Sequence, residues 1–405
     1  MKKIGYLLLA LFLVIGLLGN FSYAQEKSVI DTISERIEFH GELEAGFQVD
    51  SIGYRKGRTD SSDFDLITAG FAIDAAITDW IHVTAVPLFE IDDFFIDEGH
   101  VTVGPTDRIP FYVSAGMHYF PFGRREEYTH FPDDPFINLP ITLYFGEIQD
   151  PGVIFGFTHE VPGMPGHSVT AEAYIYKPWQ YACGPYDSIK ETEHADSYGV
   201  DLHYNVEMED YTFEIGGSYT SNIMASSGIK DFFEDRPLSM EMEGAVDGKL
   251  LASTESVPIY IDSKIDAIAA YMSGTCRNFY FTAEYMQSVE PFRMEELVDP
   301  DGESPLPHLW TVEVGADISE YLSEYLGLST PVELMFRYAG STEATHIYEI
   351  PRNRWAAGLN IGIHDYATWS LAYAYNDYDE DYESVTCGPD ARNRSLFFTQ
   401  IAVEF

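Results

Sequence analysis

The stretch Ile37 to Asp50 reads IEFHGELEAGFQVD, and it alternates between two kinds of side chain along its whole length. The odd positions carry apolar or small residues, and the even positions are mostly polar and rich in carboxylates. A repeat of two residues indicates a β-strand with one apolar and one polar face. In a soluble sandwich the apolar face would meet a protein core, whereas in a membrane barrel it would meet lipid and the polar face would line a wet lumen.

The first residues predict export from the cytoplasm. MKKIGYLLLALFLVIGLLGNFSYA has two lysines, a long apolar run and a small-x-small end, which is the pattern of a secretory signal peptide cleaved after Ala24. We therefore expect a signal peptide over residues 1–24, a short periplasmic segment over 25–36 and a single barrel domain over 37–405. The segment before the barrel is too short for a plug domain. No later stretch of eighteen apolar residues predicts a transmembrane helix.

The composition excludes some classes of protein. The formal net charge is -43, with 66 acidic residues against 23 lysines and arginines, and such a surface repels nucleic acid. Acidic disordered chains are poor in aromatic residues, but this chain contains 28 tyrosines and 27 phenylalanines. These residue types favour β-strands and the aromatic girdles of membrane barrels, so the composition predicts a folded β protein.

Further alternating segments of about ten residues follow the first one and continue to RSLFFTQIAVEF at the end of the chain. We count about sixteen, and bacterial barrels require an even number. Short turns alternate with longer loops, of which Ser51 to Asp63 is the first, so both ends of the barrel lie on the periplasmic side. The sequence thus predicts an all-β fold, a transmembrane antiparallel barrel of about sixteen strands. The alternative, a soluble sandwich, is the less favoured reading of the same pattern.

The expected partners follow from the barrel. The odd residues of the first segment, Ile37, Phe39, Leu43 and Phe47, should face outer-membrane lipid and lipopolysaccharide. The terminal Phe405 resembles the signal by which such proteins are handed to the barrel assembly machinery. A homo-oligomer is left open, because no residue pattern favours or excludes it.

Sixteen strands enclose an aqueous channel rather than a packed core. Inward parity predicts a polar lumen wall that includes Glu38, His40, Glu42, Glu44, Arg337 and Arg354. Inward carboxylates outnumber inward basic groups, and rings of carboxylates bias a pore toward cations.

The third outer loop, Pro121 to Pro151, is unusually long and apolar. Loops of this size usually have a function or pack on themselves. Folding into the lumen would bury its apolar side chains and narrow the pore, whereas the alternative is an external cap over neighbouring loops. In the first case the constriction would be lined by Arg124, Arg125, Glu126, Glu127, Tyr128, Asp133, Asp134 and Glu147.

The same region carries a family resemblance. YVSAGMHYFPFG, followed by DDPFINLPITLYFGEIQDPGVIFGF, resembles the siderophore porins of the LbtU type, and the likeness extends over roughly Ser34 to Phe157. The resemblance implies an outer-membrane channel that takes up ferric siderophores without the energy-coupling complex that drives plugged receptors.

Cysteines and acidic runs give weaker signals. Cys183 in ACGP and Cys387 in TCGP both lie in outer loops and form a candidate disulfide, while Cys276 lies in a periplasmic turn. An odd number of cysteines leaves at least one unpaired or intermolecular. The acidic runs at 299–303 and 377–381 lack the full signature of a calcium loop, so we expect no metal site and no cofactor.

Taken together, these patterns predict a non-enzymatic porin for passive or energy-coupling-independent uptake of small solutes, with ferric siderophores as candidates. One alternative is a barrel-borne lipase or protease, although the sequence has no G-x-S-x-G motif and its histidines are scattered. Another is a surface adhesin, because Ser221 to Asp262 is a long polar outer loop.

Overall fold

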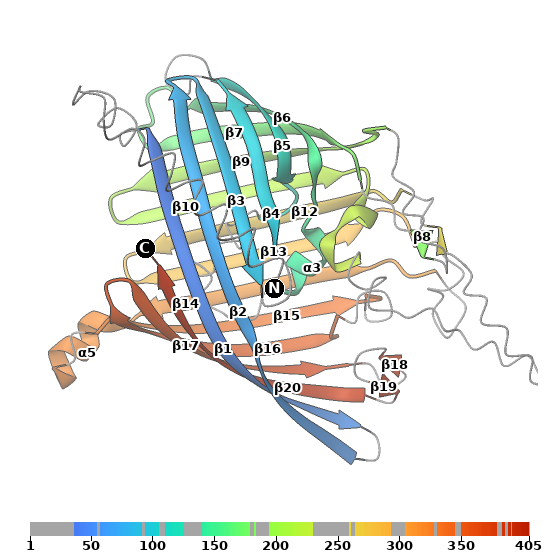
Figure 1. Ribbon diagram of the computed structural model, residues 1–405, viewed down its shortest axis with the longest axis vertical. Helices are drawn as coiled ribbons and strands as arrows, with labels where there is room; N and C mark the ends of the chain where they lie inside the picture. The colour runs from blue at the N-terminus through green and yellow to red at the C-terminus, as the bar shows by residue number, and fades with distance from the viewer. Residues whose placement is uncertain are drawn as a thin grey trace, which may run out of the picture.

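The strands of the computed structural model close into one antiparallel barrel (Figure 1). The structure describes residues 36–54, 57–90, 94–104, 110–124, 140–178, 182–183, 194–229, 259–260, 264–292, 304–327, 330–344, 350–378, 383–384, 388–389 and 391–404. The predicted signal peptide, most of the periplasmic segment and Phe405 lie outside these residues.

Sixteen strands form the closed ring, each hydrogen-bonded to the next, and the last strand pairs with the first. In ring order they are β1 (Ile37–Tyr54), β2 (Gly57–Thr78), β3 (Ile81–Glu90), β4 (Phe94–Val103), β5 (Phe111–Tyr119), β6 (Gln149–Glu160), β7 (His167–Tyr176), β9 (Ser197–Met208), β10 (Tyr211–Thr220), β12 (Ala267–Cys276), β13 (Phe279–Ser288), β14 (His308–Asp317), β15 (Val332–Thr342), β16 (Asn353–His364), β17 (Ala367–Asp377) and β20 (Ala391–Glu404). The predicted fold class is confirmed.

The exposure of the side chains of β1 shows which of its faces points out of the barrel. Leu43 is 49% exposed on the outside of the barrel, whereas its neighbour Glu44 is only 3% exposed on the inside. Glu42 is buried on the same inner face, and Phe39 is exposed on the outer one. Because strand side chains alternate between the faces of a sheet, the apolar set of β1 faces lipid and its carboxylates face the lumen.

Aromatic side chains mark the level of the membrane interface on the outer surface. At the end of the barrel with the shorter connections, exposed aromatic residues stand in or beside the turns: Trp80, Phe111, Tyr211, Phe279 and Tyr366. Such rings have an apolar body, and membrane barrels carry girdles of them at both interfaces. This band defines the periplasmic rim.

The connections alternate between short and long, as the sequence predicts. Short turns such as the one between Met208 and Tyr211 lie at the periplasmic end, and the helix α5 (Ser319–Leu326) lies in the turn between β14 and β15. The predicted first outer loop is a different case. β1 continues to Tyr54 and β2 starts at Gly57, so most of the segment from Ser51 to Asp63 is a paired ribbon. β1 also pairs with β20 as far as Tyr54, which gives that half of the ribbon partners on both edges.

Short two-residue strands pair among the outer connections. β8 (Ala182–Cys183) pairs with β11 (Ile259–Tyr260), and β18 (Glu383–Ser384) pairs with β19 (Gly388–Pro389). Two of the outer connections contain short helical elements. These are α3 (Ile141–Gly146), between β5 and β6, and the 3-10 turn η2 (Ile223–Ala225), between β10 and β12. No helix in the described part of the chain is long and apolar enough to cross a membrane.

The topology predicts which insertions can be reached on intact cells. An epitope tag inserted at Gly57, at the tip of the outer ribbon, should bind antibody on whole cells, because Gly57 lies at the end of the barrel opposite the short turns. A tag at Met208, in a periplasmic turn, should bind only after the outer membrane is opened. Labelling of a Met208 tag on intact cells would show that the assigned orientation of the barrel is wrong.

Candidate functional site: a charged lumen narrowed by the third loop

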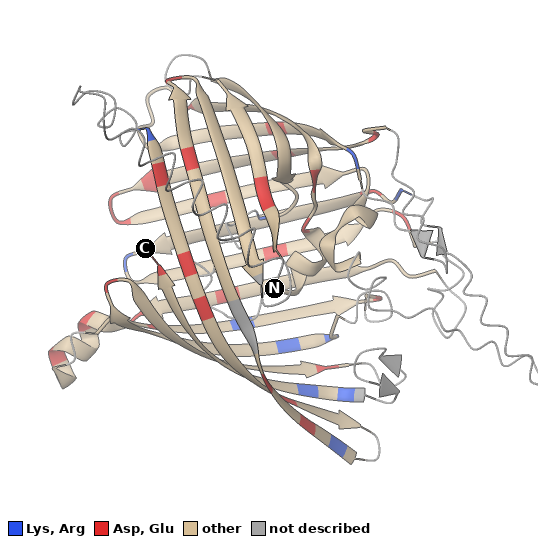
Figure 2. Cartoon of the chain, viewed as in Figure 1, with Lys and Arg blue, Asp and Glu red and all other residues tan. Residues whose placement is uncertain are grey.

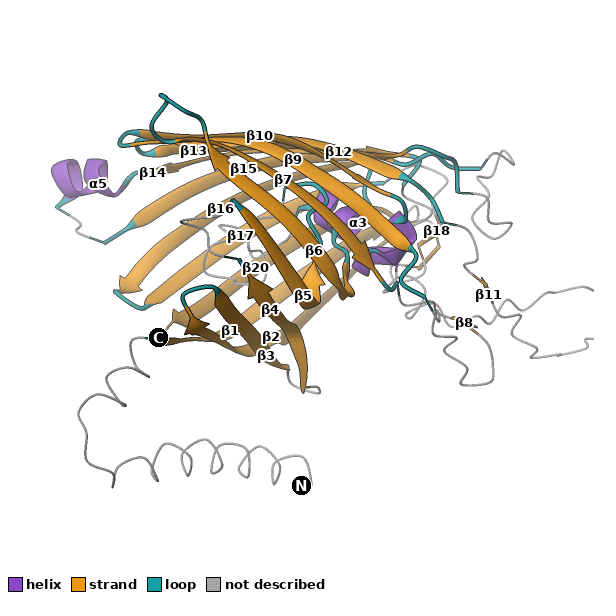
Figure 3. Ribbon diagram, turned by 90° about the horizontal axis from the view of Figure 1, so that it is seen from above, coloured by secondary structure: helices purple, strands orange, loops and turns teal. Residues whose placement is uncertain are grey.

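The described part of the third loop lies inside the barrel (Figure 3). α3 starts directly after Pro140. The first backbone N–H groups of a helix have no partner within the helix, so proline, which lacks an N–H, is tolerated at this position. Thr142 on α3 donates a hydrogen bond to Thr311 on β14 at 3.2 Å. Before the helix, the backbone N–H of Gly123 donates to the Ser218 hydroxyl on β10 at 2.7 Å.

The apolar side chains of this loop form a core with the lumen wall. Ile141, Phe145 and Ile148 have no exposed surface, and they share one cluster with Met286 on β13 and Leu309 on β14. Each fully buried large apolar side chain contributes about 1.5–3 kcal/mol. The loop therefore folds inward, and its described residues do not form the external cap that was the alternative.

Two of the predicted constriction residues in this loop are described. Arg124 contacts β13, where its backbone N–H donates to the Glu284 carboxylate and its guanidinium donates to the Thr282 hydroxyl. Glu147 follows α3, and its carbonyl oxygen accepts a hydrogen bond from the Ser227 backbone N–H at 2.8 Å. The remaining six, Arg125, Glu126, Glu127, Tyr128, Asp133 and Asp134, lie outside the described residues, so their place in a constriction stays a prediction.

Three arginines form a basic belt on one side of the lumen, and we define the belt as Arg337, Arg354 and Arg394. Arg337 on β15 pairs with Glu313 on β14, with 2.6 Å between Nε and Oε2, and its side chain is 1% exposed. This pair sits in direct cross-strand register.

The other two arginines extend the belt around the ring. Arg354 on β16 donates to the Asn376 amide oxygen on β17 at 2.8 Å. Arg394 on β20 forms an ion pair with Asp50 on β1 at 2.8 Å. The belt members lie on β15, β16 and β20, and their partners lie on β14, β17 and β1, which together are adjacent strands of the ring. Figure 2 shows blue bands on β15, β16 and β20.

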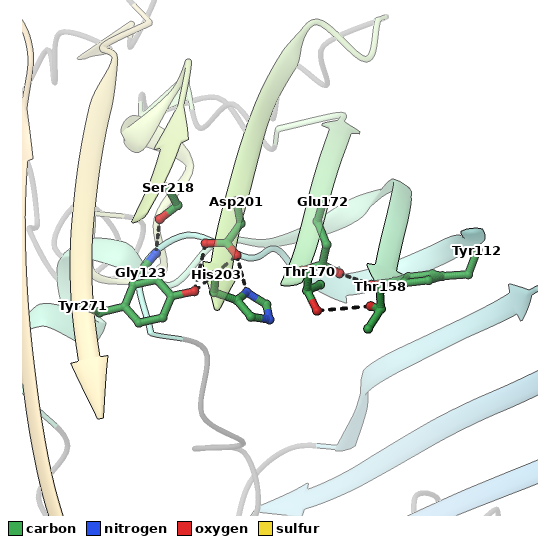
Figure 4. A network of polar contacts seen from close by, with 9 residues as sticks. All are labelled: Tyr112, Gly123, Thr158, Thr170, Glu172, Asp201, His203, Ser218 and Tyr271. Atoms are coloured by element: carbon green, nitrogen blue, oxygen red, sulfur yellow. Dashed lines mark hydrogen bonds and ion pairs between the residues drawn. The ribbon is translucent and has the colours of Figure 1, made fainter. Parts of the chain in front are cut away.

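Carboxylates and tyrosines line another part of the lumen (Figure 4). Asp201 on β9 accepts hydrogen bonds from Tyr271 at 3.1 and 3.2 Å and pairs with His203 at 2.7 Å. Tyr112 on β5 donates to Glu172 on β7. We call Glu172, Asp201 and Glu214, which interact electrostatically with His203, the acidic wall.

The acidic wall lies opposite the Arg394 end of the basic belt. In ring order β9 is the eighth strand and β20 is the sixteenth, so Asp201 and Arg394 lie on opposite walls of a sixteen-stranded ring. Opposed charges create a field across the lumen, and restricted water makes each charge act more strongly than on an open surface. This arrangement can orient and sort ions and charged solutes.

The structure places the other predicted wall residues along the inner face. Glu42 and Glu44 are buried on the inside of β1, and Glu38 and His40 follow the same parity at the periplasmic mouth, where both are exposed and lie 3.9 Å apart. Sequence reasoning missed Asp50 and Arg394. Their signal was available, because Arg394 has the parity opposite to the lipid-facing Phe397 and Ile401.

Not all of the inner wall is polar. On the β15–β20 side, an apolar cluster points inward, made of Met335, Ala356, Ala372, Ala374, Leu396 and Phe398. Three of its six members are alanines, which leave space beside the arginine belt, and the whole cluster lowers the local polarity. Alternation alone does not predict this patch.

The structure describes the side chain of one of the three cysteines. Cys276 is exposed with a free thiol, whereas the side chains of Cys183 and Cys387 lie outside the described part of the chain, so their disulfide stays a prediction. Within the described residues, no three His, Cys, Asp or Glu side chains are placed to hold a metal ion.

Comparison with known sequences identifies distant relatives. A UPF0422 protein of Coxiella burnetii is 22% identical over 283 residues, which are 70% of this chain and 51% of that protein. A UPF0422 protein of Legionella pneumophila is 23% identical over 292 residues, which are 71% of this chain and 47% of that protein. The chain thus spans about half the length of the curated relatives it matches. No protein-family model matches the chain.

Comparison with solved structures gives the fold. An anion-selective porin from Comamonas acidovorans matches 91% of this chain and 99% of its own, with a TM-score of 0.53 and 9% identity. OmpF of Salmonella typhi, solved in complex with daunomycin, matches 91% of this chain and 97% of its own at the same TM-score and identity. The protein therefore shares the fold of these porins, here a closed barrel of sixteen strands, and this fold places it in a bacterial outer membrane.

Proposed function

We propose that the protein is an outer-membrane channel for the passive uptake of small solutes, working without energy coupling, and that ferric siderophores are among these solutes. The observation that carries the proposal is the inward placement of charge. Glu44, Asp201, Glu313, Arg337 and Arg354 all point into the barrel, while exposed apolar side chains cover its outside.

A dry interior would not accommodate this many charges. The cost of removing one ion from water is several kcal/mol after relaxation, and an ion pair recovers it only with good geometry. A barrel of sixteen strands is also wide enough to hold water. A water-filled lumen therefore supports a path for polar solutes from one mouth to the other.

The position of the third loop supports selective rather than unrestricted flow. α3 packs against β13 and β14 and so fills one side of the lumen. Tyr144 on α3 lies near Arg354, so the arginine belt borders the space that α3 leaves. The siderophore part of the proposal is supported by the sequence resemblance over Ser34 to Phe157, which includes this loop.

The purified protein should conduct ions in a planar bilayer and transport the proposed solute in liposomes. We expect discrete conductance steps, and we expect proteoliposomes to take up a radiolabelled ferric siderophore down its gradient with no energy source. Liposomes without protein provide the control. Conductance without siderophore flux would limit the proposal to a general porin, and absence of conductance would remove the channel function itself.

A further inference from the structure

The fifth outer connection, between β10 and β12, begins with a segment that folds into the lumen beside α3. Residues Ile223, Met224, Ala225 and Ile229 of this segment are buried in the same apolar cluster as Phe145. A polar loop that was exposed to solvent would not bury four apolar side chains in this cluster. We call residues 221–229 the loop-five segment.

The base of the loop-five segment is fixed to the barrel wall. The Ile223 backbone N–H donates to the Ile265 carbonyl at 2.9 Å, and the Tyr176 hydroxyl donates to the Asn222 carbonyl at 2.9 Å. The Asn222 side chain in turn donates to the Ser197 hydroxyl at 3.1 Å. Three wall strands or their ends therefore hold this segment in place.

The tip of the loop-five segment contacts the third loop through backbone atoms. The Ser227 N–H donates to the Glu147 carbonyl, immediately after α3, at 2.8 Å. A Cβ atom built on Gly228 would overlap the backbone carbonyl of Tyr144. Since backbone atoms cannot rotate away as a flexible side chain can, only glycine permits this approach.

We infer that the loop-five segment is a second constriction element, and that Gly228 is the positioning residue that sets where α3 sits in the lumen. α3 is held on one side by β13 and β14 and on the other by this segment. The third loop alone therefore does not determine the width of the pore. This inference rests on the proposed channel function for its effect on conductance, but not for the coupling between the two loops.

The first test uses Gly228→Ala, with Gly57→Ala as a matched control because a Cβ atom at Gly57 meets open space. Gly228→Ala should shift the single-channel conductance away from the wild-type value and should speed hydrogen exchange of the amides in residues 141–148. Gly57→Ala should change neither. Migration of unheated protein on a gel checks that each barrel is folded.

A second pair of variants isolates the backbone hydrogen bond. Ser227→Pro removes the N–H that binds Glu147, whereas Ser227→Ala keeps it. We expect faster exchange in residues 141–148 for the proline variant and wild-type exchange for the alanine variant, so a folding failure of Gly228→Ala does not end the test.

The outcomes separate this inference from the channel proposal. Unchanged exchange in both Gly228→Ala and Ser227→Pro would overturn the coupling, whether or not the protein conducts. Faster exchange with unaltered conductance in a conducting protein would overturn the role of Gly228 in the constriction. A wild-type protein that does not conduct would remove the proposed function, while exchange would still decide whether the loops are coupled.

Discussion

Replacing Phe145 with aspartate should release α3 from the lumen wall and produce the largest rise in single-channel conductance of any single substitution. Phe145 has no exposed surface in the apolar cluster that holds the third loop. Loss of the ring alone costs about 3–5 kcal/mol, and an unpaired carboxylate in an apolar site adds further cost. α3 would then be released from the lumen wall in most molecules, and the space that it fills would open to ions.

Phe145→Leu is the control for this experiment, because leucine keeps a large apolar side chain in the cluster that holds α3. It should conduct nearly as the wild type does. Both variants should still assemble, since the sixteen-stranded ring closes without α3. If Phe145→Asp assembled and its conductance matched that of the wild type, α3 would not restrict the pore.

Neutralising the arginine belt should strengthen the cation preference that we expect from the excess of inward carboxylates. A unit charge about 10 Å from a passing ion in water changes its energy by about 0.4 kcal/mol, with opposite signs for cations and anions. In roughly 0.1 M salt the Debye length is about 10 Å, so screening lowers each of these energies to about a third. Replacing Arg337, Arg354 and Arg394 by glutamine in one variant should then raise the ratio of cation to anion permeability roughly threefold to tenfold at that salt concentration.

Reversal potentials across a salt gradient measure this ratio. Glutamine keeps N–H donors for the partners of the belt, such as Glu313 and Asn376, so the wall should stay folded. Arg58→Gln is the matched control, since Arg58 is exposed near the tip of the β1–β2 ribbon. If the triple variant had the wild-type permeability ratio, the belt would not act on ions in the lumen. The same conclusion would follow if the ratios of the two proteins differed equally at molar salt, where screening should remove the effect of the belt.

Much of the fold can be predicted from the sequence because a membrane barrel is governed by local rules. Each strand must alternate, since one face meets lipid and the other meets water, and each hydrophobic error would be costly. The alternation in β1 and the parity of the connections are therefore visible residue by residue. A clear difference in the strands, the ribbon that extends β1 to Tyr54, arises where the strands leave the membrane and the polarity rule no longer applies.

The candidate site was predictable only in part. The length and apolar character of the third loop were enough to predict that it folds inward, because its side chains could not remain in water. Its partners were not predictable. Gly228 lies about eighty residues beyond α3 in the chain, and nothing local to it indicates contact with the backbone of Tyr144. The same is true of the pairing of Arg394 with Asp50, which depends on closure between the last strand and the first.

The sequence by itself determined the fold class, an approximate number of strands and which face of β1 points outward. These properties follow from short-range periodicity and from the requirement that every backbone group in a bilayer be hydrogen-bonded. Only the tertiary structure decided that Arg394 lies across the ring from Asp201, and that two inward-folded loops meet at Gly228. Ring closure and loop packing join residues far apart in the chain, and such contacts depend on shape and space that no local pattern encodes.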